Sequence, residues 1–179
     1  MYRGQRISVV IPCHNEEEGV RAVMAQMPAI VDEVVVVDNA STDRTAEVAR
    51  GLGARVIFEG RKGYGRAYKT GFSEAQGDVI VTMDGDGTYP PTSIPLLLDV
   101  LLAEQLDFMT ARRWRSRNDK SKSPLRLLGN AVLSGATMML FGRFLVDSQS
   151  GMWVFRRDAL PKFQPQADTM ALSQEIKIL

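Results

Sequence analysis

Two aspartates that stand one residue apart are the clearest sign of chemistry in the sequence. The stretch TMDGDGTYPP, residues 82–91, contains Asp84 and Asp86, and a glycine follows each of them. Two neighbouring carboxylates repel each other unless a cation or water offsets their charge. One cation bound by oxygen ligands is the simplest explanation for the pair, and the glycines would let a ligand lie close to the backbone.

The spacing of the surrounding residues indicates which cation fits this stretch. A calcium loop between two helices needs glycine at its sixth position and glutamate at its twelfth. Counted from Asp84, these positions hold Tyr89 and Pro95, so the calcium template fails. Mg²⁺ or Mn²⁺, whose coordination is completed by water and by the phosphates of a ligand, suits two carboxylates better. We therefore predict a magnesium or manganese site that accepts a diphosphate.

The aspartates follow one of four apolar runs that resemble buried strands. These runs are short and nearly continuous, as is typical of strands buried on both faces, and they cover residues 7–12, 33–38, 54–58 and 78–84. Helical patterns separate the runs, and strand–helix–strand repeats with short connections form right-handed units. The sequence therefore predicts an α/β fold in which a mainly parallel sheet is flanked by helices.

Polar residues at the helix entrances predict where the first two helices begin. Asn15 is expected to cap an amphipathic helix that carries Val20 and Val23 on its apolar face. Ser41 or Thr42 is expected to cap the next helix, which ends at a glycine. Both helices would then start just beyond a strand.

The elements after Tyr89 follow a looser pattern. Residues 90–105 read as a helix with proline at its entrance, and residues 107–111 as a strand. A polar, basic stretch then leads to a predicted helix over 124–141 and a predicted strand near 152–157. The final residues, LSQEIKIL, read as the opening of a helix.

Polar side chains also follow the first two predicted strands. His14 and Glu16 come after the first strand, and Asp38 and Asn39 come after the second. Ligands of an open parallel sheet bind beyond the carboxyl ends of its strands, so we expect these residues and the aspartate pair to share one crevice. Taken alone, Asp38 and Asn39 also fit a turn that leads into a helix. His14 is the single histidine, which excludes a metal cage built from histidines.

The composition is that of an ordinary globular domain and excludes several classes of protein. Of the 179 residues, 45% are hydrophobic and 24% are charged, and the net charge of +1 argues against nucleic acid as a partner. Cys13 is the only cysteine, which fits a reducing compartment such as the cytoplasm. No uncharged apolar run approaches the roughly 20 residues that a membrane-spanning helix needs.

A basic segment lies downstream of the predicted metal site. Between residues 112 and 126 it has one acid, Asp119, and seven basic residues: Arg112, Arg113, Arg115, Arg117, Lys120, Lys122 and Arg126. A solvated loop is the usual meaning of such a run. Because the segment also carries Trp114, binding to a phosphate or to an anionic membrane surface is the alternative.

The glycine-rich stretch GRKGYGRAYKTGF, residues 60–72, does not match a known nucleotide loop. It lacks the Gly-Lys-Ser/Thr of a Walker loop, and Tyr68 stands where a dinucleotide fingerprint has its third glycine. A flexible entrance to a helix explains the stretch equally well.

Five stretches in the same order resemble one enzyme family. VVIPCHNEEEGV, VVVVDNASTDRT, GRKGYGRAYKTGF, VTMDGDGTYPP and DSQSGMWVFRRDAL occur in the order seen in inverting family 2 glycosyltransferases, which have the Rossmann-like GT-A fold. The sequence is most similar to the dolichyl- or polyprenyl-phosphate sugar transferases, the group of dolichol-phosphate mannose synthase. The resemblance implies that residues 1–179 form a single glycosyltransferase GT-A domain that lacks its C-terminal end.

The resemblance also assigns roles to residues. It implies that the donor, a nucleotide-sugar, is bound by Pro12, His14, Glu16, Asp38, Asn39, Gly63, Gly65, Met83, Asp84, Gly85, Asp86, Gln149 and Ser150. Asp84 and Asp86 match the DxD motif that holds the metal, and Thr88 stands where the family often has a glutamine ligand. Asp86, Arg112 and Arg126 are the implied catalytic residues, the two arginines lying near phosphates.

The implied activity is a metal-dependent, inverting transfer of a hexose from GDP-mannose or UDP-glucose to a polyprenyl or dolichyl phosphate. A phosphate monoester is already substantially ionised near neutral pH, with a second pKa of about 6, so the acceptor needs little help from a general base. Such a protein is expected in the cytoplasm, bound peripherally to the cytoplasmic face of a membrane.

Three alternatives remain open from the sequence. A family 2 transferase that acts on a saccharide would need a carboxylate base near the acceptor hydroxyl, such as Asp147. A sugar nucleotidyltransferase would carry a glycine-rich loop with a lysine or arginine after the first strand, which CHNEEEG lacks. A module that binds a nucleotide-sugar without turnover would show neither hydrolysis nor transfer.

Overall fold

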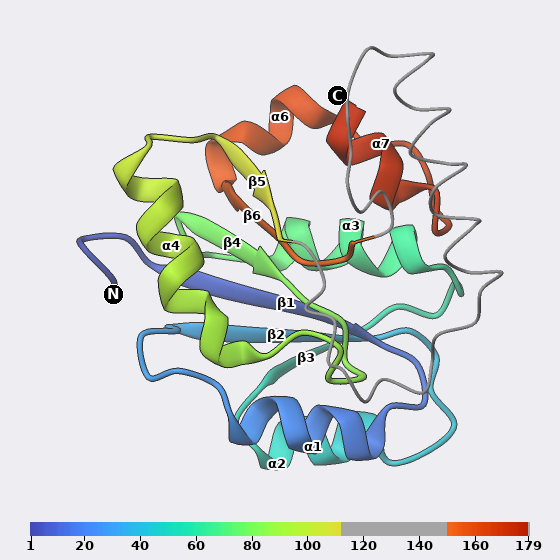
Figure 1. The fold of residues 1–179 in the computed structure, drawn as a ribbon. Coiled ribbons are helices and arrows are strands. Elements are labelled where there is room, and N and C mark those ends of the chain that lie inside the picture. Colours follow the sequence, from blue (N-terminus) through green and yellow to red (C-terminus); the bar gives the residue numbers. More distant parts are fainter. Residues whose placement is uncertain (112–149, 179) are drawn as a thin grey trace, which may run out of the picture.

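A computed structural model describes residues 1–111 and 150–178 of the chain (Figure 1). Within these residues, six strands form one sheet in the order β3-β2-β1-β4-β6-β5. The strands are β1 (Ile7–Cys13), β2 (Glu33–Asp38), β3 (Arg55–Phe58), β4 (Val79–Thr82), β5 (Phe108–Thr110) and β6 (Trp153–Arg156). All six lie at or near the ranges that the sequence predicts, so these predictions are confirmed.

The sheet is mainly parallel. Strand β1 pairs in parallel with β2 on one side and with β4 on the other, and β3 extends this parallel part beyond β2. Strand β6 runs antiparallel to both of its neighbours, β4 and β5. The carboxyl ends of β1, β2 and β4 therefore meet at the same edge of the sheet.

Helices cover both faces of the sheet, which gives three layers (Figure 1). One core contains side chains of α1 (Glu17–Ala25), α2 (Thr45–Gly51) and α4 (Ile94–Ala103). The core on the opposite face contains side chains of α3 (Tyr64–Glu74) and α7 (Leu172–Ile178), with α6 (Leu160–Phe163) packed against it. Consecutive residues of β1 contribute to opposite cores, which explains its continuous apolar run.

The predicted helix caps are wrong, for a reason that matters for the site. Asn15 has a φ of 59°, and its side-chain oxygen accepts the N–H of Thr42 at 2.7 Å instead of capping α1. Ser41 in turn accepts the N–H of Asn15 at 3.0 Å through its hydroxyl oxygen. Near the start of α2, Asp43 accepts the N–H of Thr45 at 3.0 Å. These polar residues therefore cross-link the loops after β1 and β2, so that the two loops form one wall.

Two of the remaining predicted helices are confirmed, and a third lies outside the residues that the structure describes. The predicted helix after Tyr89 is present as α4, preceded by a short 3₁₀ turn at Pro91–Ser93, and the final residues form α7. The predicted helix over 124–141 lies outside the described residues. Within the described ranges, none of the helices combines the length and apolar character that crossing a bilayer requires.

Candidate functional site

A cavity of about 450 Å³ opens at the carboxyl ends of β1, β2 and β4. It is the place that the open parallel sheet predicts for a ligand. Its lining combines residues from the ends of these strands, from the loop before α3, from α3 itself and from the segment before α7: Pro12, Cys13, His14, Glu16, Asn39, Lys62, Gly63, Tyr64, Ala67, Asp84, Gly85, Asp86 and Met170. Strand register brings Cys13 level with Asp38, which is why the loops after β1 and β2 meet.

The structure gathers most, but not all, of the predicted donor-binding residues around this cavity. Eight of them line it: Pro12, His14, Glu16, Asn39, Gly63, Asp84, Gly85 and Asp86. Four others are described but are not in its lining: Asp38, Gly65, Met83 and Ser150. Thr88, the third predicted metal ligand, is not in the lining either. The predicted residues Arg112, Arg126 and Gln149 lie outside the described residues, as does Asp147.

The two aspartates of the predicted metal site have different surroundings. Asp84 is half-buried, and its Oδ1 accepts hydrogen bonds from the hydroxyls of Tyr64 at 3.1 Å and Tyr68 at 3.3 Å. Asp86 is exposed and accepts the N–H of Thr88 at 2.8 Å, in a turn where Gly87 has a φ of 77°. Thr88 thus contacts Asp86 through its backbone and is itself exposed.

Negative charge gathers at the part of the cavity that Asp84 and Asp86 line. Partial burial raises the pKa of Glu16, and the negative charges of Asp86, Asp43 and Asp84 raise it further. Among residues 1–111 and 150–178, no three Asp, Glu, His or Cys side chains are placed to hold a metal ion by themselves. A cation bound by Asp84 and Asp86 would therefore need oxygen ligands from phosphate and water, as Mg²⁺ and Mn²⁺ commonly have. The two carboxylates are ligands that fit this class of ion.

Two tyrosines and a cysteine beside Asp84 keep their protons. Burial, and then the charge of Asp84, raises the pKa of the Tyr64 hydroxyl, and burial raises that of Tyr68. Both hydroxyls therefore act as hydrogen-bond donors at neutral pH. Burial also raises the pKa of the Cys13 thiol, which is 2% exposed, so Cys13 behaves as a core residue and not as a thiolate ligand.

Lys62 brings positive charge to the cavity and was missed by the sequence analysis. Its ammonium lies 3.4 Å from Nε2 of His14, and Nδ1 of His14 lies 2.9 Å from the backbone oxygen of Asn39. A carbonyl only accepts and an ammonium only donates, so this arrangement fits a neutral His14 ring with its proton on Nδ1. The only signal for Lys62 was the glycine-rich stretch, which a flexible helix entrance explained equally well.

Asn39 holds the loop that carries Lys62. Its side-chain nitrogen donates to the backbone oxygens of Glu59 at 3.0 Å and Arg61 at 2.8 Å. Its side-chain oxygen accepts the N–H of Gly63 at 2.8 Å. These three bonds occupy both amide hydrogens and one oxygen lone pair, so Asn39 shapes the cavity wall through the backbone of residues 59–63. A carboxylate at this position could not donate to the two carbonyls.

We therefore expect Asn39→Asp to lower the free energy of unfolding by about 1–3 kcal/mol, because two carbonyls lose their donors and face a negative charge. Binding of UDP should weaken in the same variant. The matched control is Asn15→Asp, since Asn15 uses its side-chain oxygen as an acceptor, and this change should stay within about 0.5 kcal/mol. Urea denaturation of the two variants checks the expectation, and equal stability would contradict it.

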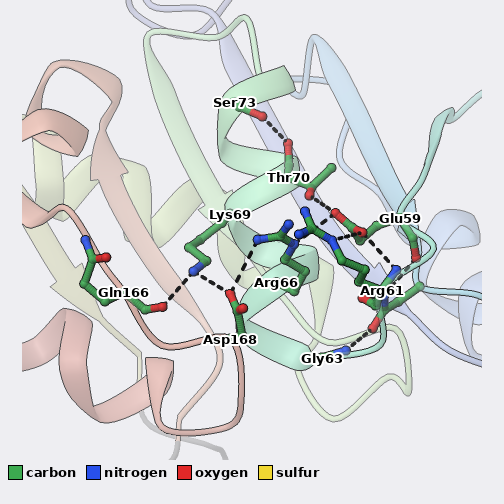
Figure 2. A network of polar contacts seen from close by, with 10 residues as sticks. Glu59, Arg61, Gly63, Arg66, Lys69, Thr70, Ser73, Gln166 and Asp168 are labelled. Atoms are coloured by element: carbon green, nitrogen blue, oxygen red, sulfur yellow. Dashed lines mark hydrogen bonds and ion pairs between the residues drawn. The ribbon is translucent and has the colours of Figure 1, made fainter.

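Ionic contacts around α3 hold the neighbouring segments in place (Figure 2). Glu59 accepts the N–H of Arg61 at 2.9 Å and the hydroxyl of Thr70 at 2.8 Å. On the other side of the helix, the Lys69 ammonium lies 2.6 Å from a carboxylate oxygen of Asp168 and donates to the backbone oxygen of Gln166 at 2.8 Å. The loop before α3 and the segment that leads to α7 are thereby fixed to one helix.

Close backbone packing explains two glycines at the aspartate pair, Gly85 in the turn itself and Gly19 in α1. A Cβ on Gly85 would lie 2.7 Å from the sulfur of Cys13, and a Cβ on Gly19 would lie 2.2 Å from the backbone oxygen of Gly85. Helix α1 therefore packs directly against the loop of the two aspartates. A Cβ on Gly65 would lie 2.3 Å from the backbone oxygen of Ala167. Gly65 therefore lets α3 pack closely against the segment that leads to α7.

Three predicted site residues make structural contacts. Asp38 accepts the N–H of Ser41 at 3.0 Å, which matches the turn that the sequence allowed as an alternative. Met83 is fully buried in the core. Ser150 is also fully buried, and its backbone oxygen accepts the indole N–H of Trp153 at 2.7 Å and the ammonium of Lys177 at 3.0 Å.

Solved structures contain the same architecture with ligands bound. Glucosyl-3-phosphoglycerate synthase from Mycobacterium tuberculosis, in complex with Mn²⁺, UDP-glucose and phosphoglyceric acid, superimposes with a TM-score of 0.76 and is 26% identical. The match covers 97% of this chain and 64% of the synthase chain, so the chain spans less than two thirds of that protein. A UDP complex of the same synthase gives a TM-score of 0.77. The expected GT-A fold is confirmed.

Sequence comparisons agree with the structural match. A dolichyl-phosphate hexose transferase of Haloferax volcanii is 34% identical over 180 residues, which cover 99% of this chain and 77% of the relative. The low-salt glycan biosynthesis hexosyltransferase Agl6 of the same organism is 34% identical over 177 residues, covering 95% of this chain and 43% of the relative. The family described as Glycosyl transferase family 2 matches residues 8–163. The chain therefore belongs to glycosyl transferase family 2.

Proposed function

We propose that the protein transfers a hexose from a nucleotide-sugar, UDP-glucose or GDP-mannose, to a polyprenyl or dolichyl phosphate with inversion at the anomeric carbon. The observation that carries the proposal is the cavity in which Asp84 and Asp86 lie at a strand end together with Lys62. The dolichyl-phosphate hexose transferase relative supports the choice of acceptor. The complex of the synthase with Mn²⁺ and UDP-glucose supports the choice of metal and donor.

The two ends of the cavity would bind different parts of the nucleotide-sugar donor. Pro12, His14 and the loop held by Asn39 form the end beyond β1 and β2, where a nucleoside would lie. Asp84 and Asp86 form the end beyond β4, where the diphosphate would lie. When bound by these carboxylates, Mg²⁺ or Mn²⁺ offsets the negative charge that develops on the departing nucleoside diphosphate. In addition to the metal ion, the ammonium of Lys62 would bring a positive charge to the same cavity.

In this proposal the nucleophile that attacks the anomeric carbon is an oxygen of the acceptor phosphate. Because it is substantially ionised near neutral pH, the protein has to orient it behind the anomeric carbon and does not have to deprotonate it. We assign this orientation to Arg112 and Arg126, which lie outside the described residues. A lipid acceptor places the protein at the cytoplasmic face of a membrane, bound peripherally.

Arg112→Ala and Arg126→Ala are expected to impair transfer to a polyprenyl phosphate much more than they impair binding of the donor. Arginine grips a phosphate through two parallel hydrogen bonds that alanine cannot make. Each variant should therefore raise the KM for the acceptor, and added salt should reproduce part of the loss in the wild type. Single-turnover transfer at low and high acceptor concentration checks this, and an unchanged dependence on acceptor would contradict it.

A donor screen tests the proposed function as a whole. Release of nucleoside diphosphate is measured from UDP-glucose and from GDP-mannose, with Mn²⁺ or Mg²⁺, in the presence of polyprenyl phosphate, a saccharide, phosphoglyceric acid or no acceptor. The proposal predicts metal-dependent release that polyprenyl phosphate stimulates more than the other acceptors do. Stimulation by the saccharide would support the alternative acceptor class, and stimulation by phosphoglyceric acid would point to a soluble phosphate. Release in no arm would overturn the proposal.

A further inference from the structure

We propose that Tyr64 and Tyr68 position the carboxylate of Asp84, so that one metal ligand is held in place before the metal and the donor bind. This inference rests on the proposed function, because it takes Asp84 as a metal ligand. Both tyrosines come from α3, and both hydroxyls reach Oδ1 of Asp84, at 3.1 Å from Tyr64 and 3.3 Å from Tyr68. Helix α3 packs on the face of the sheet opposite to α1.

The ring of Tyr68 is fixed by its neighbours. Tyr68 is fully buried, and its ring centroid lies 4.9 Å from that of Tyr64, 4.9 Å from that of Trp153 and 5.7 Å from that of Phe72. Buried side chains in such contacts keep one rotamer, because interiors are closely packed. The position of the Tyr68 hydroxyl is therefore set by the core and does not depend on a ligand.

The single proton of Tyr68 has more than one acceptor within reach. Its hydroxyl lies 3.3 Å from Oδ1 of Asp84 and 3.2 Å from the backbone oxygen of Gly151. That backbone oxygen also accepts the hydroxyl of Thr82 at 2.7 Å, so it does not depend on Tyr68 for a partner. A bond to a charged acceptor is stronger than one to a neutral carbonyl, which favours donation to Asp84.

Gly151 limits the movement of the same carboxylate on another side. A Cβ on Gly151 would lie 2.8 Å from Oδ1 and 2.9 Å from Oδ2 of Asp84, and 2.5 Å from the hydroxyl oxygen of Tyr64. The carboxylate is therefore confined by two hydroxyls and by the backbone of Gly151, which precedes β6. Asp86, by contrast, is exposed and accepts the backbone N–H of Thr88 within its own turn.

Confinement of Asp84 has a consequence for affinity. A ligand group that is already oriented loses less conformational freedom when a metal binds. Hydrogen bonds to the ligands of a metal typically contribute about 10- to 100-fold to its affinity. Removing the hydroxyl of Tyr64 is thus expected to weaken Mn²⁺ binding by about tenfold, and removing both hydroxyls to weaken it further.

The experiment compares Tyr64→Phe and Tyr68→Phe with Tyr2→Phe. Tyr2 donates its hydroxyl to Asp99 at 2.6 Å and is absent from the lining of the cavity, so Tyr2→Phe removes a tyrosine–aspartate bond elsewhere. Binding of Mn²⁺ in the presence of UDP is followed by electron paramagnetic resonance, without turnover, and the melting temperature is recorded for each variant. Tyr64→Phe should bind Mn²⁺ about tenfold more weakly, and Tyr2→Phe should bind as the wild type does.

The outcomes separate positioning from stability and from the proposed function. Wild-type Mn²⁺ affinity in both Tyr64→Phe and Tyr68→Phe would overturn the inference, even if their melting temperatures fell. Weaker binding in Tyr64→Phe below its melting transition supports it, because a purely structural role does not change metal affinity in the folded protein. If the wild type binds Mn²⁺ with UDP but transfers no hexose, the proposed function fails, and the Mn²⁺ affinities of the variants still decide the positioning role.

Discussion

Asp86→Ala is expected to lower kcat/KM for the donor by at least about 100-fold, because several kcal/mol of charge stabilisation at the leaving diphosphate depend on the metal. The fold should be unchanged, since Asp86 is exposed and the change removes one of two repelling charges. Metal-dependent binding of UDP should be lost as well. Asp84→Ala should have the same effect to a lesser degree.

The control for Asp86 is another exposed aspartate. Asp158 lies in a short 3₁₀ turn after β6 and is absent from the lining of the cavity, so Asp158→Ala should leave kcat/KM unchanged. Isothermal titration with UDP and Mn²⁺, together with circular dichroism, separates a binding defect from unfolding. Asp86→Ala protein that binds UDP as tightly as the wild type, and still requires metal, would refute the metal assignment.

Gly151→Ala is expected to lower kcat/KM by about 100-fold, although glycine has no chemistry of its own. The added Cβ would lie within 2.9 Å of both carboxylate oxygens of Asp84, so the carboxylate must move. Displacements of about 1 Å at catalytic groups cost rates of this order. Overpacking at this buried position should also lower the free energy of unfolding by about 1–3 kcal/mol.

Gly51→Ala provides the comparison for this substitution. Gly51 ends α2, and a Cβ there would meet no atom within 4 Å. Alanine is the better helix former by up to about 1 kcal/mol, so this variant should be at least as stable as the wild type and equally active. Kinetics and urea denaturation of both variants test the pair. Wild-type kcat/KM in Gly151→Ala would show that Asp84 tolerates displacement.

The sequence predicted the sheet well because burial on both faces leaves a signature that needs no tertiary information. Continuous apolar runs identified the strands, and the rule that ligands bind beyond strand ends brought His14, Glu16, Asp84 and Asp86 to one cavity. The paired aspartates stood out because their mutual repulsion needs an explanation. These inferences depend on residues that are close in sequence.

The parts that could not be predicted depend on contacts between distant segments. Asn15 was expected to cap its own helix, but Thr42 of the neighbouring loop offers its N–H to the same side-chain oxygen. The role of Asn39 depends on the backbone of residues 59–63, and that of Tyr64 depends on Asp84. No local pattern contains these pairings, because only the folded sheet brings them together.

The most direct test of the account is to identify the product. Purified protein is incubated with UDP-glucose or GDP-mannose, Mn²⁺ and polyprenyl phosphate, and the organic extract is analysed by mass spectrometry and by NMR of the anomeric centre. The account predicts a hexosyl-phosphate polyprenol whose anomeric configuration is inverted relative to the donor, and no such product when EDTA removes the metal. Consumption of donor that yields only free sugar or water-soluble products, with no glycosylated lipid, would contradict it.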